Sequence, residues 1–210
     1  MKDTEEDLVW YNINPDHIWV LDKLILSKKL GYICGPTGID VPKPGWYVVR
    51  PCVNAMGLGL GAKKVFIERE TMHLPIGHFW CEWFEGRHYS VDYWPKYGTK
   101  VFTIEGIKSP AFAMYGELVK WEKWIKVKDK KEHVIPDILY PIIQNYYQIN
   151  LEFIGNKPIE VHLRPNEDFR EGKATKEFIP VWEDQEIIPP KGYRYIEYAD
   201  VNGRIGAYVK

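Results

Sequence analysis

Apolar and polar residues alternate at every second position through much of the chain, which is typical of half-buried β-strands. Helical spacing of apolar residues occurs twice, once from Asn14, a suitable N-cap before Pro15, to Gly31, and once from Pro136 to about Tyr147. The alternation predicts strands over residues 46–50, 65–68, 78–84, 88–94, 100–107, 118–127, 149–154 and 158–163, with shorter strands near 180–182, 193–198 and 204–209. The sequence therefore predicts an α+β protein in which strands dominate.

Two pairs of these strands are close enough in sequence to form antiparallel hairpins. Residues 78–84 and 88–94 flank a turn at Glu85 and Gly86, and residues 149–154 and 158–163 flank Gly155-Asn156-Lys157. In the second hairpin, strand alternation turns the apolar residues to one face. It leaves a group of polar side chains on the other face: Asn150, Glu152, Glu160, His162 and Arg164.

The polar face of that hairpin has two equally supported interpretations. Carboxylate and amide oxygens are ligands that Mg²⁺ prefers, together with phosphate oxygens of a substrate. The same alternation is also found on the solvated outer face of an ordinary hairpin. Spacing alone leaves this choice open.

Length and composition narrow the classes of protein to be considered. A chain of 210 residues, with 28 Lys+Arg against 29 Asp+Glu, can bury one core or form two small lobes, and its near-zero net charge gives no overall attraction to nucleic acids or anionic membranes. No apolar run is long enough to span a membrane and the first seven residues are mostly acidic, so we expect a cytoplasmic protein. Three widely spaced cysteines without a CxxC pair argue against a disulfide scaffold or structural zinc.

Residues 57–64 form a glycine-rich run in which Gly57, Gly59 and Gly61 precede Lys63 and Lys64. Backbone N–H groups and lysines of such a flexible flap can reach phosphates, but taken alone the run is a weak signal, and an ordinary hairpin tip is the commoner explanation. The sequence contains neither an HExxH motif nor a GxSxG elbow, which gives a zinc protease or a serine hydrolase little support.

The order of these segments resembles the ATP-grasp superfamily over about residues 17–166. The family has a "DK" helix, a "vvKP" strand, a glycine-rich flap, a hinge strand of the form E-x-x-x-G-x-x-x-S-V-D and a metal strand of the form "iEvNpR". The corresponding segments here are Asp22-Lys23, Tyr47-Val48-Val49-Arg50-Pro51, residues 57–64, Glu82 to Asp92, and Pro158 to Arg164. The chain looks most like the short ATP-grasp-like proteins of tailed bacteriophages.

The resemblance implies an ATP-grasp-like fold of two small α+β lobes with mainly antiparallel sheets, about 14–85 and 86–210 of a single unit, with ATP and Mg²⁺ bound between them. It implies a ligase that activates a carboxylate as an acylphosphate for attack by an amine or similar nucleophile, in the host cytoplasm if a phage encodes it. The implied nucleotide-binding residues are Lys23, Arg50, Gly57, Gly59, Gly61, Lys63, Glu82, Trp83, Phe84 and Glu85. The implied metal ligands are Glu152, Glu160, Asn150 and His162, and the implied catalytic residues are Arg164 and Lys63.

Two alternatives remain open. Arg50 stands where the family has lysine and His162 where it has asparagine, which favours a catalytically degenerate nucleotide-binding or structural protein, such as a phage component. The nine tryptophans also permit a carbohydrate- or nucleic-acid-binding surface if their rings are exposed. The match leaves no room for the usual N-terminal substrate domain. The tail 167–210, another protein or a macromolecular substrate would then supply recognition of the unidentified carboxylate and nucleophile.

Overall fold

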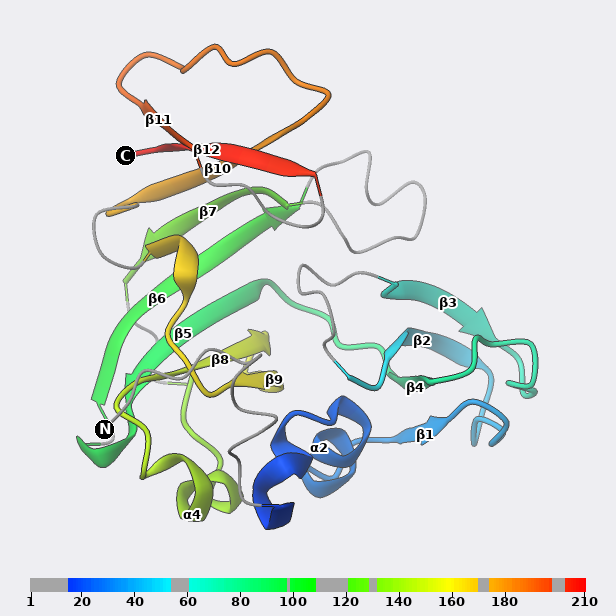
Figure 1. Ribbon diagram of the computed structural model, residues 1–210. Helices are drawn as coiled ribbons and strands as arrows, with labels where there is room; N and C mark the ends of the chain where they lie inside the picture. The colour runs from blue at the N-terminus through cyan, green and yellow to red at the C-terminus, as the bar shows by residue number, and fades with distance from the viewer. Residues whose placement is uncertain are drawn as a thin grey trace.

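The computed structural model describes residues 15–53, 61–97, 99–108, 121–128, 132–169, 174–197 and 203–210, with the backbone alone at 102, 104, 107, 108 and 121. These residues form two antiparallel β-sheets of different size, with a short helix between them (Figure 1). The α+β class and the antiparallel sheets expected from the sequence are confirmed. Gly57 and Gly59 of the glycine-rich run lie outside the described residues.

The smaller sheet has four strands in the order β1-β4-β2-β3. Its strands are β1 (Cys34–Pro36), β2 (Gly45–Pro51), β3 (Lys63–Ile67) and β4 (His78–Glu82). One face of this sheet packs its own apolar core, formed by Val41, Tyr47, Val49, Ile67, Leu74 and Trp80. The other face is turned to the site described below.

The larger sheet has eight strands in the order β11-β12-β10-β7-β6-β5-β8-β9. Its strands are β5 (His88–Trp94), β6 (Thr99–Lys108), β7 (Trp121–Val127), β8 (Ile149–Ile154), β9 (Lys157–His162), β10 (Glu177–Trp182), β11 (Arg194–Glu197) and β12 (Arg204–Val209). The predicted hairpin between β8 and β9 is confirmed, with Glu152 directly opposite Glu160 and Asn150 opposite His162.

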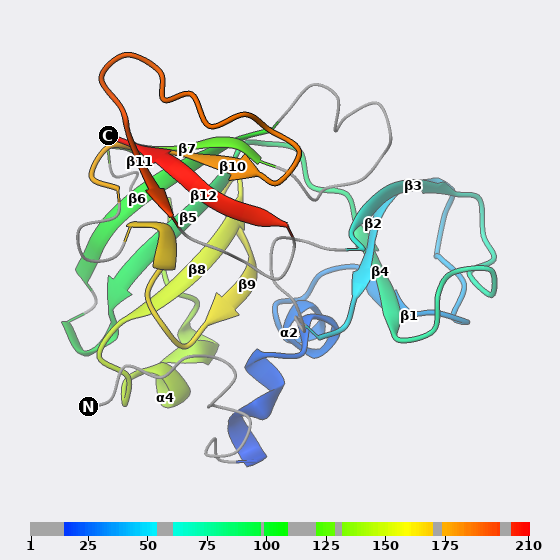
Figure 2. The ribbon, with the colours of Figure 1, turned by 45° about the horizontal axis from the view of Figure 1, so that its top comes forward.

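The two faces of the larger sheet are covered by different cores. Ile149, Leu151 and Phe153 of β8 and Val161 of β9 pack on one face with the helical segments. On the other face, Trp124 and Phe178 pack with Phe169, which follows β9 in sequence. The chain after β9 therefore folds back over the polar face of the hairpin, which is visible in Figure 2 where this segment crosses β5 and β8.

The first helical region differs from the prediction of one continuous helix. A 3-10 helix (Pro15–Val20) ends before Asp22, whose side chain caps a separate helix α2 (Lys23–Lys29) by accepting a hydrogen bond from the Ile25 N–H at 2.9 Å. Asp22 therefore precedes the helix and Lys23 is its first residue. The helix packs its apolar side on the core of the larger sheet, which contains Leu21 and Leu26.

The second helix is also shorter than predicted. The interval between Pro136 and Tyr147 forms a 3-10 turn (Asp137–Leu139) followed by one helical turn, α4 (Tyr140–Ile143). Pro141 is tolerated because it lies at the start of that turn, where its missing N–H is not needed. Across the described residues, no helix has the length and hydrophobicity needed to span a membrane.

The predicted hairpin between residues 78–84 and 88–94 does not form. Strand β4 pairs with β1 and β2 of the smaller sheet, whereas β5 pairs with β6 and β8 of the larger sheet. Residues 83–87 therefore connect the two sheets. Gly86 in this connection has φ +136°, and a Cβ there would lie 2.9 Å from the backbone nitrogen of Gly155, so the connection fits closely against the β8–β9 turn.

Candidate functional site

The candidate site lies where the β8–β9 hairpin meets helix α2 and the smaller sheet. Strand alternation turns Glu152 of β8 and Glu160 and His162 of β9 to the same face of the larger sheet. Asn150 and His162 on this face are only 2% and 7% exposed. The interpretation of a solvated outer face is therefore wrong, and these polar groups must be satisfied by one another or by a ligand.

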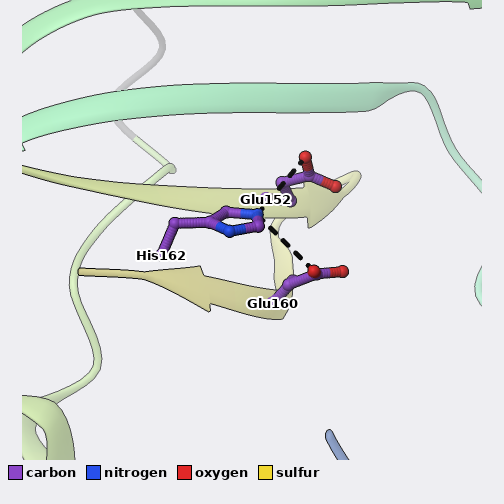
Figure 3. A group of neighbouring side chains, drawn as sticks. All are labelled: Glu152, Glu160 and His162. Atoms are coloured by element: carbon purple, nitrogen blue, oxygen red, sulfur yellow. Dashed lines mark ion pairs between the residues drawn. The ribbon is translucent and has the colours of Figure 1, made fainter. Parts of the chain in front are cut away.

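Glu152, Glu160 and His162 form a compact group in which one ligand atom from each lies within 4.8 Å of the others (Figure 3). The His162 Nε2 lies 3.7 Å from Glu152 Oε1 and 3.5 Å from Glu160 Oε1. All three were predicted metal ligands. Two carboxylates and an imidazole are a donor set that fits a divalent cation.

The second oxygen of each carboxylate is held by a different neighbour. Glu152 Oε2 lies 2.9 Å from His88 Nε2, and Glu160 Oε2 lies 3.1 Å from Lys23 Nζ and 3.9 Å from Arg50 Nη1. Burial raises the pKa of Glu152, but the interactions with His88 and His162 outweigh it and bring this pKa well below its usual range. The Oε1 atoms of both glutamates are thereby left facing His162.

Arg50 crosses from the smaller sheet to the larger one. Its guanidinium donates a hydrogen bond to the Ile159 carbonyl at 2.8 Å, while its Nε is buried without a hydrogen-bond partner among the described residues. As whole residues, Arg50 is 8% exposed and Lys23 is 6% exposed. Two buried cations and an unsatisfied N–H at one place make this a position where an anionic group would bind favourably.

The register of the smaller sheet separates the two lysines of the flap. Lys64 pairs with Val48 and so lies on the face of Arg50, whereas Lys63 pairs with Val49 and lies on the opposite face. The Lys64 Nζ contacts the rings of Trp83 and Trp46, at 4.2 and 5.2 Å from their centroids. Lys64, rather than Lys63, is therefore the flap lysine that shares a surface with Arg50.

The connection between the sheets carries the residues predicted to line a nucleotide pocket. Glu82 accepts a hydrogen bond from the Ile33 N–H at 3.0 Å, and the Trp83 indole N–H donates to Glu85 at 2.8 Å. The ring of Phe84 lies 4.8 Å from that of Tyr32, edge to face. These contacts position the connection. Gly61, the described glycine of the flap, lies in the turn before β3 with φ +75°.

A buried polar network lies beside the group of Glu152, Glu160 and His162. Asn150 donates its amide hydrogens to Ser90 Oγ and Asp92 Oδ1, both at 2.7 Å, and the Asn166 backbone N–H also donates to Asp92. Burial raises the pKa of Asp92 to about 6, against the lowering effect of these hydrogen bonds and of the Arg164 charge. The structure thus places Asn150 against Asp92, and the charge of Arg164 acts on the same carboxylate.

His88, Ser90 and Asp92 were not among the predicted site residues. Their alternation with Tyr89, Val91 and Tyr93 was visible in the sequence, but β5 was assigned to a hairpin with β4. Pairing with β8 brings all three polar residues to the face of Glu152. The missing information was the long-range strand order, which local alternation does not contain.

Neither the protein-family models nor the curated proteins that were searched contain a match to this chain. Among solved structures, the chain is similar to a protein from Archaeoglobus fulgidus described as an ATP-grasp superfamily member (TM-score 0.48, 15% identity, 91% of this chain and 64% of the other). It is also similar to an L-amino acid ligase from Bacillus licheniformis (0.47, 13%, 70% and 40%) and to the ATP-grasp ligase PsnB (0.46, 10%, 77% and 57%). The chain thus spans 40–64% of the length of these structures.

Proposed function

We propose that the protein is an ATP-dependent ligase of the ATP-grasp type that requires a divalent cation and joins a carboxylate to an amine or similar nucleophile. The observation that carries the proposal is the convergence of Lys23, Arg50 and Glu160 between the two sheets, beside Glu152 and His162. Buried cations beside a carboxylate pair suit a nucleotide triphosphate and its metal ion. The motif order along the chain supports the same assignment.

In this proposal Lys23 and Arg50 contact the phosphates of ATP. Arg164 neutralises the phosphoryl group in transfer, and the flap of residues 57–64 closes over the nucleotide, with Lys64 as the flap lysine on the face of Arg50. The connection from Glu82 to Glu85, with Trp83 and Phe84, borders the adenine and ribose. Glu152, Glu160 and His162 hold the cation, with Asn150 beside them. When bound, such an ion would supply positive charge that offsets the charge of the phosphates.

The chemistry that follows is a carboxylate activation in two steps. A carboxylate oxygen of the first substrate attacks the γ-phosphorus of ATP, the bond to ADP breaks, and an acylphosphate forms. The amine then attacks the carbonyl carbon, loses a proton, and inorganic phosphate leaves. Lys23 and Arg50 contribute by positioning phosphates and absorbing their charge. The identities of both substrates, including a macromolecular one, are open.

A thermal-shift experiment tests nucleotide binding. ADP with a divalent cation at about 100 times its dissociation constant stabilises the folded state by about 2.7 kcal/mol, which for a chain of this size raises the melting temperature by roughly 5–10 °C. Arg50→Met should remove most of that increase, whereas Lys28→Met, an exposed lysine on the same helix as Lys23, should keep it. An unchanged melting temperature of the wild-type protein across millimolar ATP and ADP would refute the proposal.

The second candidate is a catalytically degenerate, nucleotide-binding or structural protein. The two departures from the family pattern, Arg50 and His162, favour it. ADP release from ATP on addition of a panel of carboxylates and amines distinguishes the two. Nucleotide binding without ADP release across that panel would support the second candidate over the first.

A further inference from the structure

The arrangement of Glu152, Glu160 and His162 indicates which kind of metal ion the site binds. Each carboxylate has one oxygen held by another side chain, Glu152 Oε2 by His88 and Glu160 Oε2 by Lys23 and Arg50. The Oε1 atoms of Glu152 and Glu160 lie 3.7 and 3.5 Å from His162 Nε2. Two oxygens and one ring nitrogen therefore converge on one place before any ion is bound (Figure 3).

The nitrogen decides the preference among ions. Mg²⁺ is a hard cation that binds oxygen and seldom exchanges a water for imidazole. Divalent first-row transition ions bind carboxylate oxygen and imidazole nitrogen together. At the same strand position, an amide side chain would supply an oxygen, and His162 supplies none.

The neighbouring strand makes the donor set more rigid. His88 fixes Glu152 at 2.9 Å and is itself packed edge to face on Trp124, with ring centroids 5.5 Å apart. Side chains behind the ligands that fix their orientation raise metal affinity and selectivity. His162 is 7% exposed, so its ring has little freedom to turn away from the two carboxylates.

We propose that Glu152, Glu160 and His162 bind a divalent first-row transition ion in preference to Mg²⁺, through His162 Nε2 and one oxygen of each glutamate. The inference shares its residues with the proposed function, but it needs no nucleotide and its test contains none. A protein that fails to bind ATP would leave the result of this test unchanged. The competing explanation is that a protonated His162 neutralises the two carboxylates without any metal.

The experiment uses Mn²⁺ as the probe with the full-length, nucleotide-free protein. Electron paramagnetic resonance measures free and bound Mn²⁺ during a titration, Mg²⁺ is then added as competitor, and a pulsed measurement detects coupling of the bound ion to ¹⁴N. We expect one bound Mn²⁺, a ¹⁴N coupling, and displacement by Mg²⁺ only at more than about a tenfold excess. His162→Asn should lose the ¹⁴N coupling and reduce the preference for Mn²⁺ about tenfold.

His73→Asn is the matched control, because His73 is exposed and lies in the connection between β3 and β4 of the smaller sheet. It should keep the wild-type coupling and preference. Absence of Mn²⁺ binding, bound Mn²⁺ without ¹⁴N coupling, a coupling that persists in His162→Asn, or displacement by an equal concentration of Mg²⁺ would each overturn the proposal. If His162→Asn does not fold, the wild-type ¹⁴N coupling and Mg²⁺ competition still decide it.

Discussion

The ion pair between Lys23 and Glu160 connects helix α2 to strand β9, and its energetic role can be measured. The two side chains are 7% and 12% exposed and their charged atoms lie 3.1 Å apart. At that distance an effective dielectric constant of about 20 gives an attraction of about 5 kcal/mol, part of which is offset by desolvation of both charges. Arg50 and His162 also lie close to Glu160, and their presence reduces the destabilisation caused by removing Lys23.

We therefore expect Lys23→Met to lower the free energy of unfolding by about 3 kcal/mol, since it leaves the glutamate with weaker partners. Glu160→Gln should cost a similar amount, because Lys23 and Arg50 then lose their carboxylate. The double variant should lose about 2 kcal/mol less stability than the sum of the two single losses. Lys28→Met, at an exposed position of the same helix, should change stability by less than about 0.5 kcal/mol.

Urea denaturation followed by tryptophan fluorescence and by far-ultraviolet circular dichroism measures the wild type and all four variants. Coincident transitions by the two probes establish two-state unfolding, which this double-mutant cycle of Lys23 and Glu160 requires. Additivity of the two substitutions within about 0.3–0.5 kcal/mol would show that Lys23 and Glu160 do not interact, and would refute the reasoning. A loss below about 1 kcal/mol for Lys23→Met would do the same, because a buried pair should cost more to break.

Three further predictions concern the surroundings of the site. The pKa of Asp92 is raised from 3.8 to about 6, so ionisation of this buried carboxyl opposes folding as the pH rises toward and above 6. The free energy of unfolding of the wild type, relative to Asp92→Asn, should therefore increase by up to about 3 kcal/mol when the pH is lowered from 7 to 4. Urea denaturation at the two pH values measures this, and a constant difference would contradict it. Gly86→Ala should lower the free energy of unfolding by more than about 2 kcal/mol, because the added Cβ would clash with the β8–β9 turn. Gly192 also has a positive φ but has open space around it, so Gly192→Ala should cost only about 1 kcal/mol. Equal losses for the two variants would exclude the close fit at Gly86. Trp80→Ala should lower the free energy of unfolding by about 3–5 kcal/mol because Trp80 is only 3% exposed, whereas Trp46→Ala should cost far less because Trp46 is 54% exposed. Urea denaturation measures both variants, and a larger loss for Trp46→Ala would contradict the burial of Trp80.

Strand alternation alone was enough to predict the core of the candidate site. The β8–β9 hairpin is local, its turn contains Gly155 with φ +60°, and side-chain period two fixes which residues share a face. Glu152, Glu160 and His162 were therefore placed together from the sequence. Their burial could not be predicted in this way, because it depends on the chain after β9 folding back over the same face, where Asn166 donates to Asp92.

The failures came from interactions between segments distant in sequence. Proximity along the chain favoured a β4–β5 hairpin, yet β5 pairs with β8, some 60 residues further on, with Asp92 opposite Asn150. For the same reason His88, which contacts Glu152, was not among the predicted site residues. The choice between Lys63 and Lys64 depends on the register of β3 against β2, and a shift of one residue exchanges their faces.

The contacts of Glu160 couple the two kinds of ligand that the proposed function requires. In the structure this carboxylate holds Lys23 and Arg50 through Oε2 and faces His162 through Oε1. A cation bound to Glu160 neutralises part of its charge and weakens its attraction for Lys23 and Arg50, so both become better partners for phosphate. Phosphate bound to those cations in turn leaves Glu160 in need of a new counter-charge. Under the proposed function, the ion and the nucleotide would by linkage each favour binding of the other, through their shared contact with Glu160.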